Sequence, residues 1–282
     1  MLVTMLTLIT SVQFEFIKPF LPVVKNRRPK KYSDYVLLNG LLFLLRTGCQ
    51  WRNIPSDYLP WKSIYWFWSK VNYCGCLDVI MKCVFNTLHT QVVDTPKTHI
   101  LITNSQSIDS SECLRKEQNG YDGNKKRNGL KRFVLCDTTG IVCGIFCSTG
   151  NADEKRSLRS YLLSQTLAHT KWNQITLIAD KGFESGKLQR ELFTKLKLSF
   201  APMKKKKKYK KSRYAEKIIE QEEMARHEFN KWIRSMRYVV EPVFSWFNRF
   251  RRLVRCFERT AQCHTNFCKL ASICLGLKRM NF

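Results

Sequence analysis

The sequence predicts an α/β protein in which a small, all-helical domain precedes a mixed β-sheet with flanking helices. Up to about residue 93, apolar residues recur at helical spacing. From residue 100 onward, strand-like runs come first around a hairpin turn and then alternate with helical stretches. A length of 282 residues and a hydrophobic content of 44% are sufficient for a sizeable core.

The first well-defined helix is expected to begin near Tyr35. Ser33 or Asp34 can cap it, and its apolar face runs through the leucines from position 37 to position 45. Gly48 is expected to end it.

A compact turn over residues 51–60 and an aromatic-rich helix from Lys62 to Lys70 are expected next. Two helices joined in this way resemble a helix-turn-helix reader of DNA, although most of the aromatic side chains are expected in the core. The basic residues around this turn are candidate DNA contacts: Arg46, Arg52, Lys62 and Lys70.

The sheet is expected to contain at least four strands. Residues 100–103 form a buried strand with a polar tip, and residues 133–136 and 141–146 form a hairpin around Asp137–Gly140. Residues 175–179 form the fourth strand, between helical stretches at 157–168 and 185–196. Residues 215–258 are expected to be helical, with a break near Pro242, and their arginines at 249, 252, 255 and 259 to form one basic stripe.

The net charge of +27 points to a polyanionic partner, either nucleic acid or an anionic membrane. Residues 201–282 hold 21 basic and 7 acidic residues and supply +14 of this charge. Residues 204–213 carry eight basic side chains, whose repulsion predicts a loop or arm beside the substrate. The candidate contacts in this arm (203–214) are Lys204, Lys205, Lys206, Lys207, Lys208, Lys210 and Lys211.

No apolar run approaches the ~20 residues that a membrane-spanning helix needs, and residues 1–9 lack the pattern of a signal peptide. The twelve cysteines are therefore expected to be reduced thiols in a cytoplasmic, nucleoid-associated protein. Cys263, His264 and Cys268 offer zinc ligands, but their spacing matches no two-pair zinc pattern, and Cys143 and Cys147 lie in an apolar strand. A structural zinc ion is not expected.

Three positions have the sequence context expected for the side chains of a two-metal phosphoryl-transfer site: Asn104, Asp180 and Glu241. Asn104 and Asp180 follow strands, so the two can be neighbours if those strands are adjacent. Lys181 lies beside the second position, and Arg237, one helical turn before Glu241, can contact phosphate or orient the carboxylate. The alternatives are a helix cap for Asp180 and a surface ion pair for Glu241.

Several blocks in the right order resemble bacterial insertion-sequence transposases of the DDE type, in the branch related to insertion sequence five. The resemblance covers nearly the whole chain, and the blocks are residues 38–55, 104–107, 120–126, 131–140, 179–183 and 237–253. It implies a ribonuclease-H-like catalytic domain, Mg²⁺ or Mn²⁺ held by Asp180 and Glu241, and dimers or larger assemblies on DNA. The substrates implied are terminal inverted repeats and target DNA. Further candidate DNA contacts are Lys125, Lys126, Lys131, Arg132, Lys181, Arg237, Arg249 and Arg252.

The departure from the family pattern is Asn104, which stands where the first catalytic aspartate is expected. An amide oxygen can coordinate Mg²⁺, but it adds no charge and cannot bridge two ions as a carboxylate does. Asp109 is a poor substitute, because five residues of extended chain span about 16 Å and an odd offset points to the opposite face. We therefore expect DNA binding with absent or severely impaired catalysis.

The expected domains are residues 1–95, for DNA binding, and residues 96–282, for catalysis. The alternatives are a noncatalytic descendant that occupies or represses transposon ends, and a general polyanion-binding protein whose affinity depends on salt but not on sequence.

Overall fold

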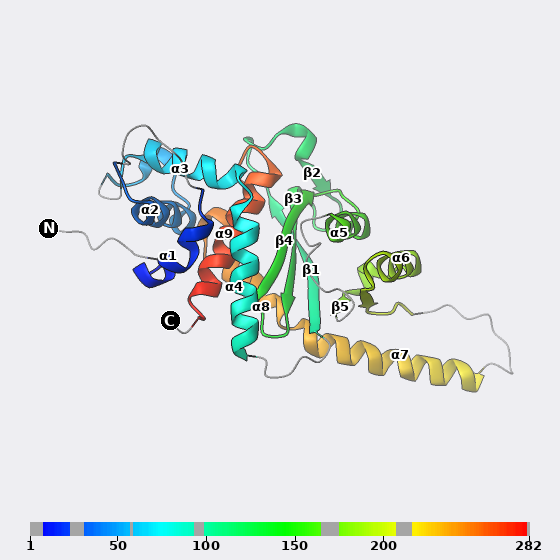
Figure 1. Ribbon diagram of the computed structural model, residues 1–282. Coiled ribbons are helices and arrows are strands. Elements are labelled where there is room, and N and C mark those ends of the chain that lie inside the picture. The colour runs from blue at the N-terminus through cyan, green and yellow to red at the C-terminus, as the bar shows by residue number, and fades with distance from the viewer. Residues whose placement is uncertain are drawn as a thin grey trace.

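The computed structural model describes residues 8–22, 31–56, 59–92, 99–164, 175–206 and 216–280. Helices cover both faces of one six-stranded mixed sheet, and a separate group of helices lies at one end of the molecule (Figure 1). Within these ranges, no helix is both long and apolar enough to cross a bilayer.

The sheet has the order β4-β3-β1-β5-β6, and the short strand β2 also pairs with β3. Neighbours among β4, β3 and β1 are antiparallel, whereas β5 runs parallel to both β1 and β6. This is the ribonuclease-H-like arrangement, so the predicted fold class is confirmed. The strands are β1 (His99–Asp109), β2 (Gly120–Asp122), β3 (Arg127–Asp137), β4 (Val142–Thr149), β5 (Ile175–Ala179) and β6 (Ser199–Pro202).

The N-terminal region is helical, as predicted. Its helices are α1 (Ser11–Ile17), α2 (Asp34–Thr47), α3 (Trp61–Tyr73) and α4 (Cys76–Val92). The Ser33 side chain caps α2 by accepting a hydrogen bond from Val36 N, and Gly48 ends it with a left-handed φ of 70°. The connection from α2 to α3 spans residues 48–60, which is longer than the turn of a helix-turn-helix motif.

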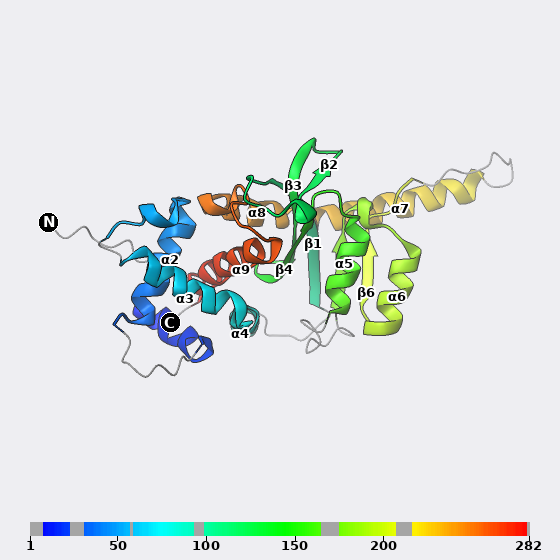
Figure 2. The same ribbon diagram turned by 90° about the horizontal axis from the view of Figure 1, so that it is seen from above.

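Alternation along the strands separates the two faces of the sheet. On one face, Leu101 and Leu177 pack with α5 (Glu154–Leu163) and α6 (Gly186–Leu196). On the other, Ile102 and Ile178 belong to a cluster with α8 (Val240–Asn248) and α9 (Ala261–Leu277), and α9 lies beside β4 (Figure 2).

The same cluster continues into α1–α4, so the helical N-terminal region and the sheet share one hydrophobic core. The division into a DNA-binding and a catalytic domain therefore stays a prediction.

The C-terminal end of the long helix α7 (Glu216–Arg237) contacts the sheet at β5, and the rest of the helix extends away from the sheet (Figure 1).

Several predicted elements have other bounds in the structure, and three of these differences concern the proposed site and DNA contacts. β1 does not end at Thr103 but continues to Asp109, because its polar residues pair along the whole of β3. The break in the C-terminal helical region lies between Arg237 and Val240, and Pro242 fits the first turn of α8, where its missing N–H costs little. The third difference concerns the predicted basic stripe. Helix α8 ends at Asn248, so the arginines at positions 249, 252, 255 and 259 do not share a helix face.

The close approach of α9 to α4 depends on Gly276. A Cβ atom at this position would collide with the Val84 side chain of α4. We predict that Gly276→Leu lowers the free energy of unfolding by about 1–3 kcal/mol, because the packed helices must separate. Urea-unfolding midpoints measure this loss. In the control Gly186→Ala, the new methyl group meets no atom within 4 Å, so no loss is expected. An unchanged midpoint for Gly276→Leu would contradict the packing described here.

Candidate active site and nucleic-acid interface

The parallel pairing of β1 with β5 brings two of the three predicted site positions to the same level. Ile102 pairs with Ile178. Asn104 lies two residues further along β1, and Asp180 lies two residues further along the chain, in extended backbone directly after β5. Because side chains alternate along a strand, both positions lie on the face that carries Ile102 and Ile178, beneath α8. The two strands are adjacent, so the condition under which Asn104 and Asp180 can be neighbours is met.

Asp180 has two partners inside the protein. It caps the short 3₁₀ helix Lys181–Phe183 by accepting a hydrogen bond from Lys181 N at 2.8 Å. The same oxygen, Oδ1, lies 3.2 Å from Arg237 Nη1, and this ion pair joins the end of α7 to the end of β5. Arg237 therefore orients Asp180, whose side chain remains 40% exposed and accessible to a ligand.

Glu241 lies in the first turn of α8 and is exposed. The buried side of this helix, including Val240 and Val243, packs in the same cluster as Ile102 and Ile178. Its carboxylate makes no hydrogen bond or ion pair with any other residue that the structure describes. The alternative of a surface ion pair for Glu241 therefore finds no support there.

Asn104 is half-buried in the middle of β1, and its Oδ1 accepts a hydrogen bond from Ser105 N at 2.9 Å. Asp109 cannot take its place, because β1 and β3 pair without a register shift from Leu101 to Asp109. Asp109 thus lies five residues along, on the opposite face, and its carboxylate is 3.6 Å from Arg127 Nη1.

Sequence reasoning missed a carboxylate near this edge of the sheet. Glu154, in the first turn of α5, accepts a hydrogen bond of 2.6 Å from Ser105 Oγ and lies 3.9 Å from Lys131 Nζ. Since Ser105 and Asn104 point to opposite faces, Glu154 approaches the strand from the side away from Glu241. The pattern Asp153-Glu154 predicts only a helix start, so no signal in the sequence distinguished it.

Asp122 and Asp137 have structural roles in turns. Asp137 Oδ1 accepts hydrogen bonds from Thr139 and from Ile141 N within the hairpin. Burial opposes the ionisation of Asp122, but hydrogen bonds from Ser107 and from the backbone of the following turn hold its pKa below the usual value.

Three of the predicted DNA contacts are wrong, because their side chains lie inside the protein. Arg132 has no exposed surface, and Arg252 is paired with Glu258 at 2.8 Å. Lys131 is only 9% exposed and lies between Asp122 and Glu154.

The remaining described candidates are accessible. Arg237 is partly exposed, and the others lie on the surface: Arg46, Arg52, Lys62, Lys70, Lys125, Lys126, Lys181, Lys204, Lys205, Lys206 and Arg249. Lys207, Lys208, Lys210 and Lys211 lie outside the described residues.

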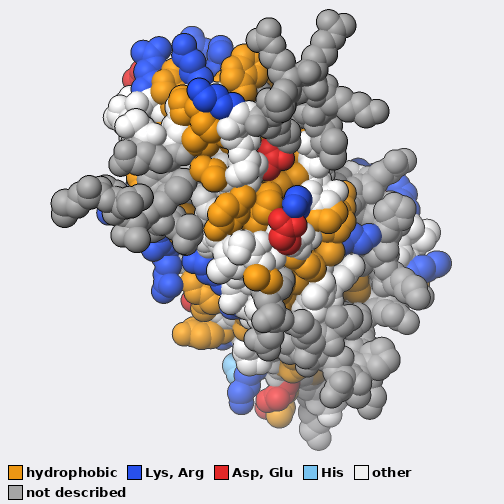
Figure 3. Space-filling model, turned by 60° about the vertical axis from the view of Figure 1, so that its left-hand side comes forward, with side chains coloured by type: hydrophobic (Ala, Val, Ile, Leu, Met, Phe, Trp, Pro, Cys, Tyr) orange, Lys and Arg blue, Asp and Glu red, His pale blue; other side chains and the backbone are white. Residues whose placement is uncertain are grey.

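The outer side of α3 combines positive charge with exposed aromatic rings. Lys62, Trp66, Lys70 and Tyr73 are exposed and recur every three or four residues, so they share one side of the helix. Figure 3, with the N-terminal helices turned toward the viewer, shows hydrophobic side chains exposed across this end of the molecule and basic side chains along its upper edge.

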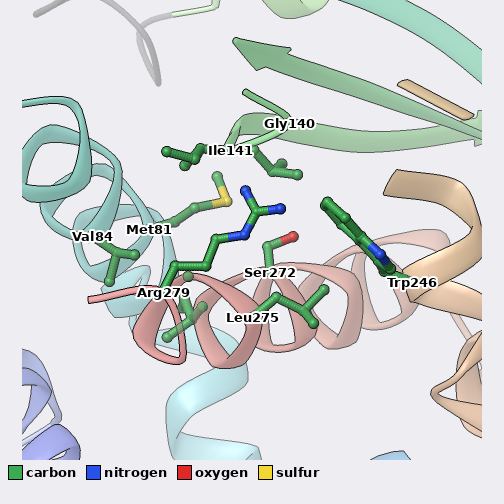
Figure 4. Close-up of a pocket in the computed structure, with 11 residues that line it drawn as sticks. Met81, Val84, Gly140, Ile141, Trp246, Ser272, Leu275 and Arg279 are labelled. Atoms are coloured by element: carbon green, nitrogen blue, oxygen red, sulfur yellow. The ribbon is translucent and has the colours of Figure 1, made fainter. Parts of the chain in front are cut away.

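An enclosed cavity between α4, α9 and the β3–β4 hairpin does not resemble an active site. It measures about 20 Å³, room for about one water molecule, and no carboxylate lines it. Arg279 is among the residues that line it, with Nη1 donating to Thr139 O at 3.1 Å and the guanidinium 4.5 Å from the Trp246 ring (Figure 4). The region where the β1–β5 pairing ends, with Asn104 and Asp180, remains the candidate active site.

Comparison with known proteins places the chain in a family. Residues 91–275 match the model described as "Transposase DDE domain", and residues 9–81 match "Putative transposase of IS4/5 family". No curated protein matches the chain.

Two solved structures show weak similarity, each at 10% identity. One is a pre-cleavage Mos1 transpososome, with a TM-score of 0.27 over 83% of this chain and 81% of that chain. The other is a Mos1 transposase paired-end complex with left transposon end, with a TM-score of 0.26 over 82% of each chain. The fold is therefore assigned from the strand order of this sheet, and the family is assigned from the matched models. The chain belongs to the transposase DDE domain family.

Proposed function

We propose that this chain is a transposase that recognises the terminal inverted repeats of an insertion sequence, with Asn104, Asp180 and Glu241 as its catalytic positions. The observation that carries the proposal is that Asn104 and Asp180 each lie two residues beyond the last β1–β5 pair, Ile102 with Ile178, beneath the helix that bears Glu241. The reaction proposed is DNA cleavage followed by transfer of the freed 3′-hydroxyl into target DNA.

The side chains at this edge fit a divalent metal ion only in part. Asp180 and Glu241 supply two carboxylates and Asn104 an amide, and Mg²⁺ and Mn²⁺ prefer such oxygen ligands. The charge is low, however, because Arg237 already pairs with Asp180. When bound, metal ions supply charge stabilisation for the attacking and leaving oxygens.

Within this chain, Arg237 holds the Asp180 carboxylate in place, and Lys181 supplies an exposed positive charge next to it for a phosphate. Asn104 is the weak point, because an amide cannot replace the charge or the bridging capacity of a carboxylate. We therefore propose that this copy binds DNA but cleaves it poorly or not at all. As a noncatalytic protein it could still occupy transposon ends and repress active relatives.

The proposed DNA contacts are the outer side of α3, the turn at Lys125 and Lys126, and the lysines that begin the basic arm at residue 204. Exposure and positive charge support these contacts. Assembly as a dimer or larger complex on paired ends, with the protein at the nucleoid in the cytoplasm, completes the proposal.

The first prediction concerns metal affinity. Asn104→Asp adds a negative charge level with Asp180, so Mn²⁺ affinity should rise about tenfold or more, equivalent to about 1.4 kcal/mol. Electron paramagnetic resonance of free Mn²⁺ during a titration measures this change. Asp109→Asn is the matched control and should leave the affinity unaltered, because Asp109 lies on the opposite face. A weaker affinity in that control would show that Asp109 is a ligand.

The second prediction concerns cleavage. In Mg²⁺, the unaltered chain should cleave a labelled inverted-repeat duplex at or near background, whereas Asn104→Asp should nick it at the transposon end. Adding Asp180→Asn to that variant should abolish nicking again. Efficient cleavage or strand transfer by the unaltered chain would refute the impairment. If Asn104→Asp stays inactive while end binding persists, the repressor function is favoured.

The third prediction concerns α3. Replacing both Lys62 and Lys70 with alanine should weaken binding to an inverted-repeat duplex and reduce the salt slope of log K by about 2, because two phosphate contacts are lost. Fluorescence anisotropy at several salt concentrations measures this slope. The control Lys187→Ala/Arg190→Ala removes the same charge from exposed positions on α6. Equal losses in the two double variants would mean that α3 makes no specific contact.

A further inference from the structure

A cluster of metal-binding side chains lies on the α9 side of the sheet, separate from the proposed catalytic edge. Cys147 comes from β4, and His264 and Cys268 come from successive turns of α9. The sulfur atoms and an imidazole nitrogen all lie within 4.8 Å of one another. Sequence spacing could not predict this group, because its third member comes from a strand more than a hundred residues away.

The cluster contains a buried polar atom without a partner. His264 is 1% exposed, and its Nε2 makes no hydrogen bond within the described part of the chain. Leaving such a nitrogen unpaired in the interior is unfavourable, so a ligand for it is expected.

A buried positive charge borders the same group. Arg132 pairs with Cys147 across β3 and β4, and its guanidinium lies 3.7 Å from Cys268 Sγ. Its oxygen partners are Gln106 Oε1 and Leu253 O, and neither is a carboxylate. A fully buried guanidinium is costly without a nearby negative charge, and the thiolates of a metal centre would supply one.

A fourth thiol lies beside the cluster. The Cys256 side chain is buried, and its sulfur donates a hydrogen bond to Glu258 O at 3.7 Å. Its backbone is fixed against the end of β1, because Cys256 N donates to Asp109 O and Cys256 O accepts from Ser111 N, both at 2.8 Å.

We propose that Cys147, His264 and Cys268, with Cys256 as the fourth ligand, form a structural zinc site. Three sulfurs and one imidazole nitrogen in a closed, buried setting are a common zinc ligand set, and thiolates select soft metals over Mg²⁺. Zinc–sulfur bonds of about 2.3 Å place tetrahedral ligands nearly 4 Å apart. The group of Cys147, His264 and Cys268 would therefore contract by at most about 1 Å, and the Cys256 sulfur would move toward it.

The charges of such a site balance. Three thiolates and one Zn²⁺ carry a net charge of −1, which the adjacent Arg132 neutralises. The site would link β4 to α9 and to the segment that precedes α9, and so stabilise the packing of α9 on its face of the sheet. This proposal departs from the sequence-based expectation that the chain has no structural zinc.

The test is the zinc content of the full chain, purified from zinc-supplemented cells and passed over a weak chelating resin. We expect about one zinc ion per chain by mass spectrometry, and an absorption band typical of tetrahedral thiolate when Co²⁺ replaces it. Less than about one ion in ten chains, with no such Co²⁺ band, would overturn the proposal, since a closed structural site retains its metal. This measurement does not depend on any variant folding.

Variants locate the site. Cys268→Ser and His264→Gln should each reduce the zinc content at least about fivefold. Cys274→Ser is the matched control, because Cys274 is also buried on α9 but its sulfur lies near Leu8 O. Zinc retained by both cluster variants, or lost equally from the control, would mean that the metal binds elsewhere. If a cluster variant does not fold, a strong chelator should lower the melting temperature of the unaltered chain and added zinc should restore it; no shift would contradict the site.

Discussion

The parallel pairing of β1 with β5 is the constraint on which the proposed chemistry depends. It is a non-local contact, because the two strands are separated by the β3–β4 hairpin and α5. Without the β1–β5 pairing, Asn104 and Asp180 would not be held at the same level, and the ion pair of Arg237 with Asp180 would not join α7 to the sheet. The helices α8 and α9 bury one face of this pairing, and α5 and α6 bury the other.

Much of this arrangement follows from local signals. Ile175–Ala179 is a short apolar run followed by an acidic residue, and the strand has the bounds that its sequence predicts. The hairpin around Asp137 is specified by its turn residues, and Gly48 ends α2 because a left-handed residue is needed there. The positions of Asn104 and Asp180 at one level could be anticipated only by assuming that their strands are neighbours.

Other features depend on tertiary context that local patterns do not carry. Arg132 was expected at the DNA because positive charge alone does not indicate burial, yet it shares a strand face with Val134 and Cys136. Likewise, α9 has apolar residues on every side, so its helical periodicity is weak, and its role became clear only from its packing on β4 and α4.

The central claim is that Asn104, Asp180 and Glu241 surround one metal-binding position. The most direct measurement is anomalous diffraction from crystals of the Asn104→Asp variant soaked in Mn²⁺. The account predicts manganese between the side chains at positions 104, 180 and 241. Manganese bound instead by Glu154 on the opposite face, or by Asp180 without Glu241, would contradict it.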